Sequence, residues 1–451
     1  MQLRPILRKT WSPKPKHTRW LYEGVIVPML TYGSVVWASA THTITMQKRL
    51  STLQRLGLTS ITSVRRSTPT ASLEIIYNMP PLHLLIQERA LNTILRLNNL
   101  HEALWHPNVL TNIGHIRTLH RQLPQKPSDD VLGTPIPNRD QPYQISIQPE
   151  VPPATEGIRV FTDGSLMNEQ SGSGVYLVTP DTQLTMYERL STCTVFQTEI
   201  YAINMACFYL RAMQTSNQQI TIHVDSQAAL YALQASSIKS KLVHETVTEL
   251  NQLSTSNEVR LQWVKAHVGT EGNEEADKAA KAGSRLARIG YEVPGTKAVL
   301  KREIREARNQ AWTEIWAATE GHRQSKHYLQ GPQPDIWRDL KKLPPDKVGR
   351  SIRFITGHGF MNRHNTIVKF KNKTDAYNDP EAVLEMLCKL CEEQEETPLH
   401  IVTECPVLNT LRLSTLYQWQ LDTPPPWGTD LINFINSTEV ADLESTLTTG
   451  M

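Results

Sequence analysis

Residues 158–165 read IRVFTDGS and are the part of the chain from which its fold is most readily inferred. Ile158 and Val160 alternate with other residues as far as Asp163, a period of two that is typical of a β-strand. Gly164 and Ser165 then supply the break expected at the end of a strand. The stretch therefore predicts a strand that presents Asp163 at one edge of a sheet.

A second strand with a terminal acid lies at residues 220–230, ITIHVDSQAAL. Ile220, Ile222 and Val224 alternate before Asp225, and a helix is predicted to begin at Ser226. Asp225 is thus expected at the carboxyl end of a strand, where open α/β sheets bind ligands.

The third acid, Glu199, lies in a helix-like stretch, FQTEIYAI, at residues 196–203. Apolar residues flank it at helical spacing, which places Glu199 on the apolar face of the helix. For a single helix, the ordinary alternative is a glutamate at the edge of the stripe whose carboxylate reaches water. The flanking residues are Val195, Phe196, Ala202, Ile203 and Ala206.

The fourth acid, Asp277, lies in GNEEADKAAKAG at residues 272–283. A turn-rich stretch precedes it, and Asn273 is the predicted N-cap of a helix. Alone, Asp277 is an ordinary first-turn acid, favoured by the helix macrodipole. All four acids together indicate more, because a carboxylate at a strand end or on a buried helix face is costly unless a cation neutralises it. The set predicts a divalent-metal site.

These four blocks, with WVKAHVGTEGNEEADKAAK at residues 263–281 as the last, match in order and spacing those of type 1 ribonuclease H domains. The resemblance covers residues 158–285. It implies an α/β fold, a mixed five-stranded sheet flanked by helices, and hydrolysis of the RNA strand of RNA–DNA hybrids. Its cofactor would be two Mg²⁺ ions, or Mn²⁺, and carboxylate oxygens suit Mg²⁺ without His or Cys ligands.

The resemblance also implies a role for each residue. Asp163 would bridge both ions, Asp225 would share one of them, and Asp277 would complete the shell of the other. Glu199 would hold that second ion near the ribose 2′-OH, the group that distinguishes RNA from DNA. His267 matches the mobile-loop histidine that assists proton transfer and product release.

The whole chain of 451 residues is long enough for about three domains, so the ribonuclease H-like part is only one portion of it. The net charge of +3 is too small to indicate a partner class. The sequence contains no apolar run long enough for a membrane span and no signal-peptide pattern, so we expect no membrane partner. Five cysteines indicate a reducing, intracellular compartment, with nucleus and cytoplasm both open.

Eight prolines fall within residues 122–153, which predicts an extended, semi-rigid linker. The segments expected are a helical region (1–120), the Pro-rich linker (121–157), the ribonuclease H domain (158–285), a helical connector (286–346) and a basic, cysteine-containing region (347–451).

The helical region resembles the stretch that follows the polymerase domain in reverse transcriptases of non-LTR retrotransposons. VIVPMLTYGSVVWA at residues 25–38 and the segment 53–82 carry this resemblance. A polymerase palm needs an Asp-Asp pair in a hydrophobic hairpin, and Asp129-Asp130 lies in the Pro-rich linker instead. We therefore expect no reverse transcriptase activity, and expect the chain to be part of a larger polyprotein whose polymerase portion is a candidate partner.

Near the end of the chain, Cys388, Cys391, His400 and Cys405 give the pattern C-x2-C-x8-H-x4-C. Three thiolates and one imidazole form a closed tetrahedral Zn²⁺ set of the structural kind. The segment resembles the zinc-knuckle-like element of the same retrotransposons. The alternative is that these are buried apolar cysteines, as Cys193 and Cys207 are expected to be.

Residues 347–373 hold seven Lys or Arg and no acid, with Phe354, Phe360 and Phe370 among them. Such a segment can bind single-stranded RNA or DNA, and a solvated basic face is the alternative. Trp312 and Trp316, spaced i, i+4, are interpreted as packing residues of the connector.

Two functional hypotheses follow. One is a metal-dependent endoribonuclease that acts on hybrids during reverse transcription, and the other is a catalytically inactive remnant that binds nucleic acid. A related fold that cuts DNA is a third, less favoured reading. All four acids and His267 are present, which favours the first.

Overall fold

The computed structural model describes residues 14–445 apart from 63, 105–113, 132–134, 139–140, 149–156, 266–270, 360, 371 and 420. The chain forms two compact units. One, the sheet unit, comprises Leu91–Arg305, and the other, the helical unit, combines Met1–Ala90 with Glu306–Met451. The boundaries between the units fall within the helices α6 (Leu82–Leu104) and α13 (Lys297–Ala318).

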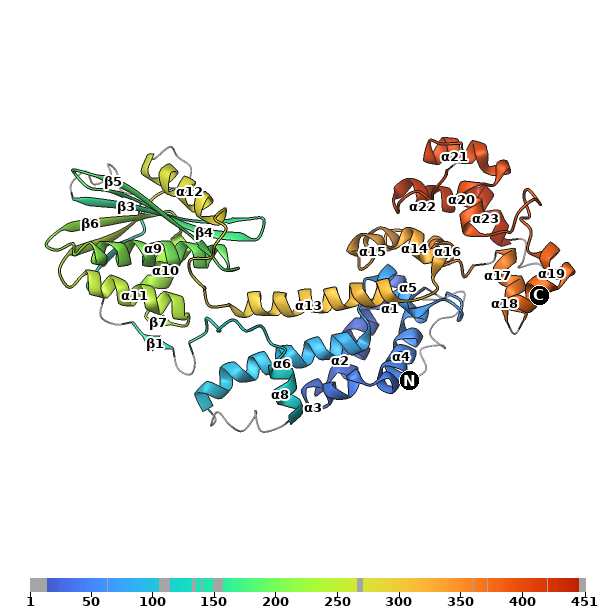
Figure 1. Cartoon of the computed structure of the whole chain (residues 1–451), viewed down its shortest axis with the longest axis horizontal. Helices are drawn as coiled ribbons and strands as arrows, with labels where there is room; N and C mark the ends of the chain where they lie inside the picture. The colour runs from blue at the N-terminus through green and yellow to red at the C-terminus, as the bar shows by residue number, and fades with distance from the viewer. Residues whose placement is uncertain are drawn as a thin grey trace. The chain divides into compact units, whose positions relative to one another are not determined.

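The sheet unit is built on a mixed six-stranded sheet with the strand order β2-β8-β6-β3-β4-β5. Strands β3, β4 and β5 form an antiparallel meander, and β6, β8 and β2 add parallel to it. Figure 1 shows the meander and β6 in green. The strands are β2 (Gln144–Ser146), β3 (Ile158–Met167), β4 (Gln170–Val178), β5 (Gln183–Leu190), β6 (Gln219–Val224) and β8 (Glu258–Trp263).

The predicted five strands are present, and the prediction of a five-stranded sheet is corrected to six. The additional strand, β2, comes from the Pro-rich segment and pairs with β8 from Gln144↔Arg260 to Ser146↔Gln262. This strand follows Tyr143, in a short stretch between the prolines of the segment. The Tyr143 side chain is buried, at 4% exposed, and so attaches the stretch to the core. A short apolar stretch can thus join a sheet edge despite nearby prolines.

Other parts of the Pro-rich segment also pack on the sheet unit, so the structure differs from a free spacer. β1 (Ile136–Pro137) pairs with β7 (Ser237–Ile238). The buried Asp129 carboxylate accepts hydrogen bonds from Leu242 N at 3.1 Å and from Ser240 Oγ at 3.0 Å. Asp129 therefore caps the helix that follows Ser240 and is a structural residue.

Helices cover both faces of the sheet. Figure 1 shows α9 and α11 on one side and α12 on the other. Apolar side chains from α9, α11 and the strands form the core, and Ile200, Ile222, Leu250 and Leu261 in it are fully buried. The helices of this unit are α8 (Gly114–His120), α9 (Val195–Ala212), α10 (Gln227–Gln234), α11 (Lys241–Leu253) and α12 (Glu271–Ser284).

Glycines allow these helices to approach the sheet closely. Alternate residues of β4 face opposite sides. Gly172 and Gly174 face α12, where a Cβ atom on Gly174 would lie 2.2 Å from Ala280 N. Ser173 faces α9, and its hydroxyl donates to Thr198 O at 2.7 Å. The close contact at Gly174 fixes how far α12, with Asp277, lies from the central strands.

The helical unit joins segments from both ends of the chain. Tyr77 packs edge-on against Trp337 with ring centroids 5.1 Å apart, and Arg308 pairs with Glu88 at 3.0 Å. Trp312 and Trp316 are 2% and 4% exposed, which confirms them as packing residues.

The helices of this unit, besides α6 and α13, are α1 (Pro15–Leu21), α2 (Val27–Thr31), α3 (Ser34–Trp37), α4 (Ile44–Thr62), α5 (Thr70–Tyr77), α14 (Arg323–Tyr328), α15 (Pro334–Leu340), α16 (Pro345–Thr356), α17 (Asn362–Ile367), α18 (Lys373–Asn378), α19 (Pro380–Glu385), α20 (Pro398–Thr403), α21 (Asn409–Leu416), α22 (Thr429–Ile435) and α23 (Thr438–Ser445). Among the described residues, no single helix combines the length and apolar character of a membrane span. One pair bent by 53°, Pro15–Thr31 with Ser34–His42, does so by length and composition alone.

The contact at Gly174 gives a first prediction. We expect Gly174→Ala to lower the free energy of unfolding by about 1 to 3 kcal/mol, because the new methyl group would overlap the backbone of α12. Urea unfolding followed by circular dichroism measures this. Gly114→Ala in the same unit is the matched control, since a Cβ atom there meets nothing within 4 Å. Equal stability of the two variants would contradict the close-approach argument.

Candidate functional site

Glu199 lies on the buried face of α9, as its sequence context predicts. Thr194 and Gln197 form a capping box at the start of this helix, which fixes where it begins. Glu199 lies one turn further along and is 6% exposed. A Cβ atom on Gly164 would lie 2.6 Å from Glu199 N. Gly164 therefore lets α9 pack directly on β3, which brings Glu199 to the sheet.

The strand that carries Asp163 does not end at Gly164, which corrects the prediction of a break there. β3 continues to Met167 because it stays paired with β4 through Gly164↔Ser173 and beyond. Its parallel pairing with β6 does end at Thr162↔Val224. Asp163 and Asp225 thus follow directly after the last paired residues of two neighbouring parallel strands.

The helix predicted to begin at Ser226 is confirmed. Ser226 is the N-cap of α10, and its hydroxyl accepts a hydrogen bond from Ala229 N at 3.3 Å. Because β6 ends at Val224 and α10 begins at Gln227, Asp225 is held in a two-residue connection. Its carboxylate is therefore fixed from both sides at the carboxyl end of β6.

Three of the four acids converge. One carboxylate oxygen from each of Asp163, Glu199 and Asp225 lies within 4.8 Å of the others. Asp163 and Glu199 are buried, and Glu199 Oε2 has no hydrogen-bond partner among the described residues. An orphaned buried carboxylate oxygen is costly unless a ligand satisfies it. The donor set is all oxygen and anionic, which fits Mg²⁺ or Mn²⁺.

The proximity of these acids perturbs their titration. Burial, followed by the charges of Asp225 and Asp277, raises the pKa of Asp163 to about 7. Burial, followed by the charges of Asp163 and Asp225, raises the pKa of Glu199 well above its usual value. Like charges that cannot escape to water disfavour ionisation in this way. A divalent cation reverses the effect, so the site is set up to exchange protons for metal.

Asp277 lies near the three acids and outside their closest grouping. It is on α12 and is close enough for its charge to raise the pKa of Asp163. Its Oδ2 pairs with Lys281 Nζ at 2.6 Å, one helical turn away. The Lys281 ammonium thus neutralises the Asp277 carboxylate. In the predicted role as a metal ligand, Asp277 would be neutralised by a metal ion instead.

Two further residues support Asp225 and were not recognised as site residues in the sequence. Asn273 Nδ2 donates to Asp225 Oδ2 at 3.4 Å, and Trp263 Nε1 donates to Asp225 O at 3.1 Å. Asn273 lies within the first turn of α12, which begins at Glu271, and not at its predicted N-cap position. His267 lies outside the described residues.

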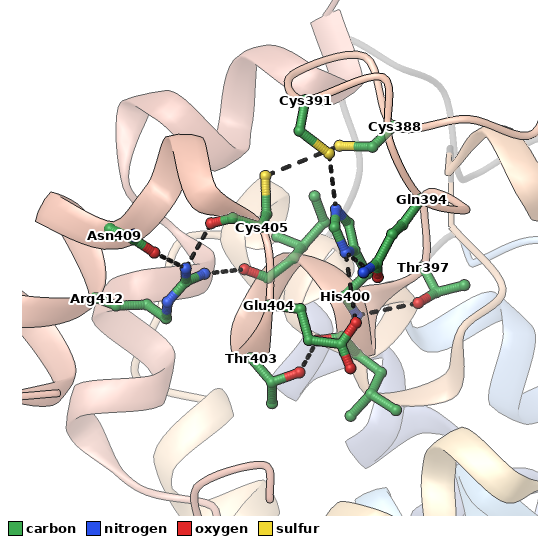
Figure 2. Close-up of polar contacts among 12 residues, drawn as sticks. Cys388, Cys391, Gln394, Thr397, His400, Thr403, Glu404, Cys405, Asn409 and Arg412 are labelled. Atoms are coloured by element: carbon green, nitrogen blue, oxygen red, sulfur yellow. Dashed lines mark hydrogen bonds and ion pairs between the residues drawn. The ribbon is translucent and has the colours of Figure 1, made fainter. Parts of the chain in front are cut away.

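A second candidate metal centre lies in the helical unit, where Cys388, Cys391, His400 and Cys405 converge (Figure 2). One donor atom from each lies within 4.8 Å of all the others. Cys388 Sγ is 4.0 Å from Cys405 Sγ, and Cys391 Sγ is 3.3 Å from His400 Nε2. Sulfur atoms on one tetrahedral Zn²⁺ lie about 3.8 Å apart. The set therefore fits a zinc knuckle.

Polar contacts orient these candidate ligands. Gln394 Oε1 lies 3.1 Å from His400 Nδ1, so a proton on Nδ1 leaves Nε2 free to bind a metal. The side chain of Arg412 is fully buried and donates to Cys405 O at 2.5 Å and to Ile401 O at 3.3 Å. It also bonds Asn409, as Figure 2 shows. Arg412 thus anchors the Cys405 backbone and places a positive charge beside the cysteine cluster.

The remaining cysteine and aromatic predictions have mixed outcomes. Cys193 and Cys207 are 1% and 0% exposed, which confirms them as core residues. Phe354 is 3% exposed, and Phe370 packs against the apolar cluster of Ala376 and Met386. The buried Phe354 ring is not placed to stack on a base, so the interpretation is wrong for Phe354, and for the partly buried Phe370 it stays a prediction. Phe360 lies outside the described residues.

Comparison with known proteins agrees with the geometry. Residues 155–285 match the family model described as RNase H. Over 79 residues the chain is 34% identical to the putative 115 kDa protein in type-1 retrotransposable element R1DM of Drosophila melanogaster. This match spans 18% of the chain and only 8% of that protein. The chain therefore contains an RNase H domain and is related to a protein of a non-LTR retrotransposon.

The raised carboxyl pKa values predict how stability depends on pH. Because the folded protein binds protons that the unfolded chain releases at about pH 4, these groups stabilise the metal-free fold most at low pH. We expect this stability to fall as the pH rises through about 7, and less so in Asp163→Asn. Urea unfolding at pH 5 and pH 8 without Mg²⁺ measures it. Asp181→Asn, at an exposed site, is the control, and an unchanged pH dependence in Asp163→Asn would refute the argument.

Arg412 gives a prediction for the cysteine cluster. We expect Arg412→Met to weaken Zn²⁺ binding by about 10- to 100-fold, because the buried carbonyls around Cys405 would lose their donor. Competition with a chromophoric chelator measures the affinity. Arg338→Met, at a side chain 56% exposed in the same unit, should bind Zn²⁺ like the unmodified protein. Equal affinities for all three proteins would remove Arg412 from this role.

Proposed function

We propose that the RNase H domain at residues 155–285 hydrolyses the RNA strand of RNA–DNA hybrids with two divalent metal ions, as part of retroelement reverse transcription. The observation that carries the proposal is the group of three carboxylates from β3, α9 and the end of β6, with their oxygens within 4.8 Å of one another. No structural role accounts for it, because the acids repel one another and Glu199 Oε2 has no partner among the described residues.

Each residue has a part in this proposal. Asp163, central among the acids, would hold both ions, with Asp225 sharing one and Glu199 and Asp277 sharing the other. When bound, two such ions activate the attacking water and stabilise the leaving 3′ oxygen. Asp277 would bind the second ion after its ion pair with Lys281 is replaced by the metal. The close contact between Gly174 and α12 would keep the helix, and with it Asp277, at the same distance from the sheet.

The protein residues contribute positioning and proton transfer. Asn273 and Trp263 hold Asp225 from two sides, through its carboxylate and its backbone carbonyl. Glu199 would lie beside the ribose 2′-OH and thereby favour RNA over DNA. His267, four residues before α12 in the sequence, would transfer a proton to the leaving group and assist product release.

The other parts of the chain are consistent with a role in a larger retroelement protein. We propose that Cys388, Cys391, His400 and Cys405 hold a structural Zn²⁺, and that a polymerase portion of the full-length product is a partner. A catalytically inactive nucleic-acid-binding remnant is the second candidate. The intact set of acids argues against it, since a binding remnant has no need to keep buried carboxylates that repel one another.

Hydrolysis of a labelled RNA–DNA hybrid tests the proposal directly. We expect the unmodified protein to cleave the RNA strand with Mg²⁺ or Mn²⁺, and Asp163→Asn and Asp225→Asn to lose about two orders of magnitude or more in rate. The reason is that a neutral amide cannot hold the metal charge at the reacting phosphate.

Asp181→Asn is the matched control, because Asp181 is an exposed acid of the same domain, and it should cleave normally. If the unmodified protein binds the hybrid without cleaving it with either metal, the inactive remnant is the correct reading. Cleavage of DNA duplex in preference to hybrid would instead indicate a DNA nuclease.

A further inference from the structure

A cleft of about 880 Å³ lies in the helical unit, whereas the acidic site belongs to the sheet unit. It lies at the upper end of the usual size range of ligand sites. Its walls come from five separate parts of the chain: α14 with the two residues before it, the end of α16 with the two residues after it, α17 with Met361, Lys373 at the start of α18, and the segment from Glu395 to Leu399. That last segment lies in sequence between Cys391 and His400 of the candidate zinc cluster.

Four of the side chains that line the cleft are Lys or Arg and two are acidic. Arg323, Lys326, Arg363 and Lys373 face two acids, Glu395 and Glu396. Both acids are neutralised within the fold. Arg323 and Lys373 are exposed, and neither forms an ion pair with another described residue; Lys373 Nζ lies 5.4 Å from the centroid of the Tyr377 ring. The cleft therefore has an excess of positive charge, with Arg323 and Lys373 exposed to an incoming anion.

The two acids have structural partners. Glu395 pairs with Arg363 at 2.6 Å. The Glu396 side chain is fully buried and accepts hydrogen bonds from Asn362 N and Lys389 N, each at 3.0 Å. Glu396 thus joins α17 to the cysteine-containing loop. Neither carboxylate is available to repel an anion or bind a cation in the cleft.

Four histidines add imidazole groups to the same walls: His322, His327, His358 and His364. His358 and His364 pack edge to face with ring centroids 4.6 Å apart. His358 Nδ1 and the Gln324 Nε2 amide are buried without a hydrogen-bond partner among the described residues. Buried donors of this kind need an acceptor, and the cleft is where one can enter.

The histidines also report the local charge. Burial, followed by Arg65 and Arg363, lowers the pKa of His364 to about 4. Burial, followed by His364, His322, Arg55 and Arg65, lowers the pKa of His358 to about 4. Positive charge from α4, from the segment after it and from α17 thus converges here. A metal is not the natural ligand, because these three histidines do not bring donor atoms within 4.8 Å of one another.

From this geometry we propose that the cleft between α14, α17 and the Glu395–Leu399 loop binds the phosphate backbone of single-stranded nucleic acid. Arg323 and Lys373 contact phosphate oxygens, and His358 and Gln324 donate to them. Among the described wall residues there is no Phe, Tyr or Trp, so the proposed ligand is the phosphate backbone and not the bases. Binding is consequently tolerant of sequence and sensitive to salt. The proposal does not depend on hybrid cleavage.

The test uses the full chain with zinc retained and fluorescein-labelled oligo(U) and oligo(dT), in buffer without added Mg²⁺. Fluorescence anisotropy at several salt concentrations gives the affinity and its salt dependence. We expect the double variant Arg323→Glu, Lys373→Glu to bind about tenfold or more weakly, and the slope of log K against log salt to fall by about 1.4.

The control is Lys48→Glu, Lys341→Glu, which makes the same charge change at two exposed sites of the helical unit that do not line the cleft. It should bind nearly as the unmodified protein does. Gln324→Ala should weaken binding without changing the salt slope, since it removes a donor and no charge. Loss for both oligonucleotides supports a backbone site, and loss for oligo(U) alone assigns it to RNA.

The proposal is overturned if the two double variants bind oligonucleotides equally, since the cleft would then contribute nothing. It is also overturned if an oligo-glutamate peptide binds at the cleft and neither oligonucleotide does. Circular dichroism and zinc content of each variant identify any that fail to fold, and the Gln324→Ala variant then carries the comparison.

Discussion

Mutual repulsion among buried carboxylates is the constraint on which the rest of the sheet unit depends. Asp163, Glu199 and Asp225 would separate if their side chains could reach water, because like charges in a poorly solvated site disfavour one another. Close packing prevents this. Gly164 lets α9 lie directly on β3, and Gly174 lets α12 lie directly on β4, with room for no side chain in between. Because packing holds the repelling acids together, a cation that binds between them relieves the repulsion and is bound more tightly.

The cysteine cluster follows the same logic with different chemistry. A hydrogen bond with Cys405, followed by burial, raises the pKa of Cys388 to about 12, while a hydrogen bond with Cys388 lowers the pKa of Cys405. Among the described residues, Arg412 places a fully buried positive charge beside them. Both centres are thus assembled by packing before any metal arrives, and each would release protons when a metal binds.

The RNase H domain lies in sequence between the two halves of the helical unit. The contacts of Tyr77 with Trp337 and of Glu88 with Arg308 join residues more than two hundred positions apart. Such contacts close a long loop, so forming them costs chain entropy that the packing of the helical unit has to offset. The cleft and the cysteine cluster both belong to this unit.

The sequence by itself determined the strands that lead to Asp163 and Asp225 and the identity of the acids, because period-two strands and the apolar face around Glu199 are local patterns. The rest of the sheet was implied by the resemblance to ribonuclease H domains. The sequence also determined the Cys3His set, whose spacing is local. Only the tertiary structure decided that β2 joins the sheet, that Gly164 is a packing contact rather than a strand break, and that Phe354 is core. It alone brought His322, His358 and Lys373 to one cleft. These outcomes depend on contacts between distant segments, and no local periodicity encodes them.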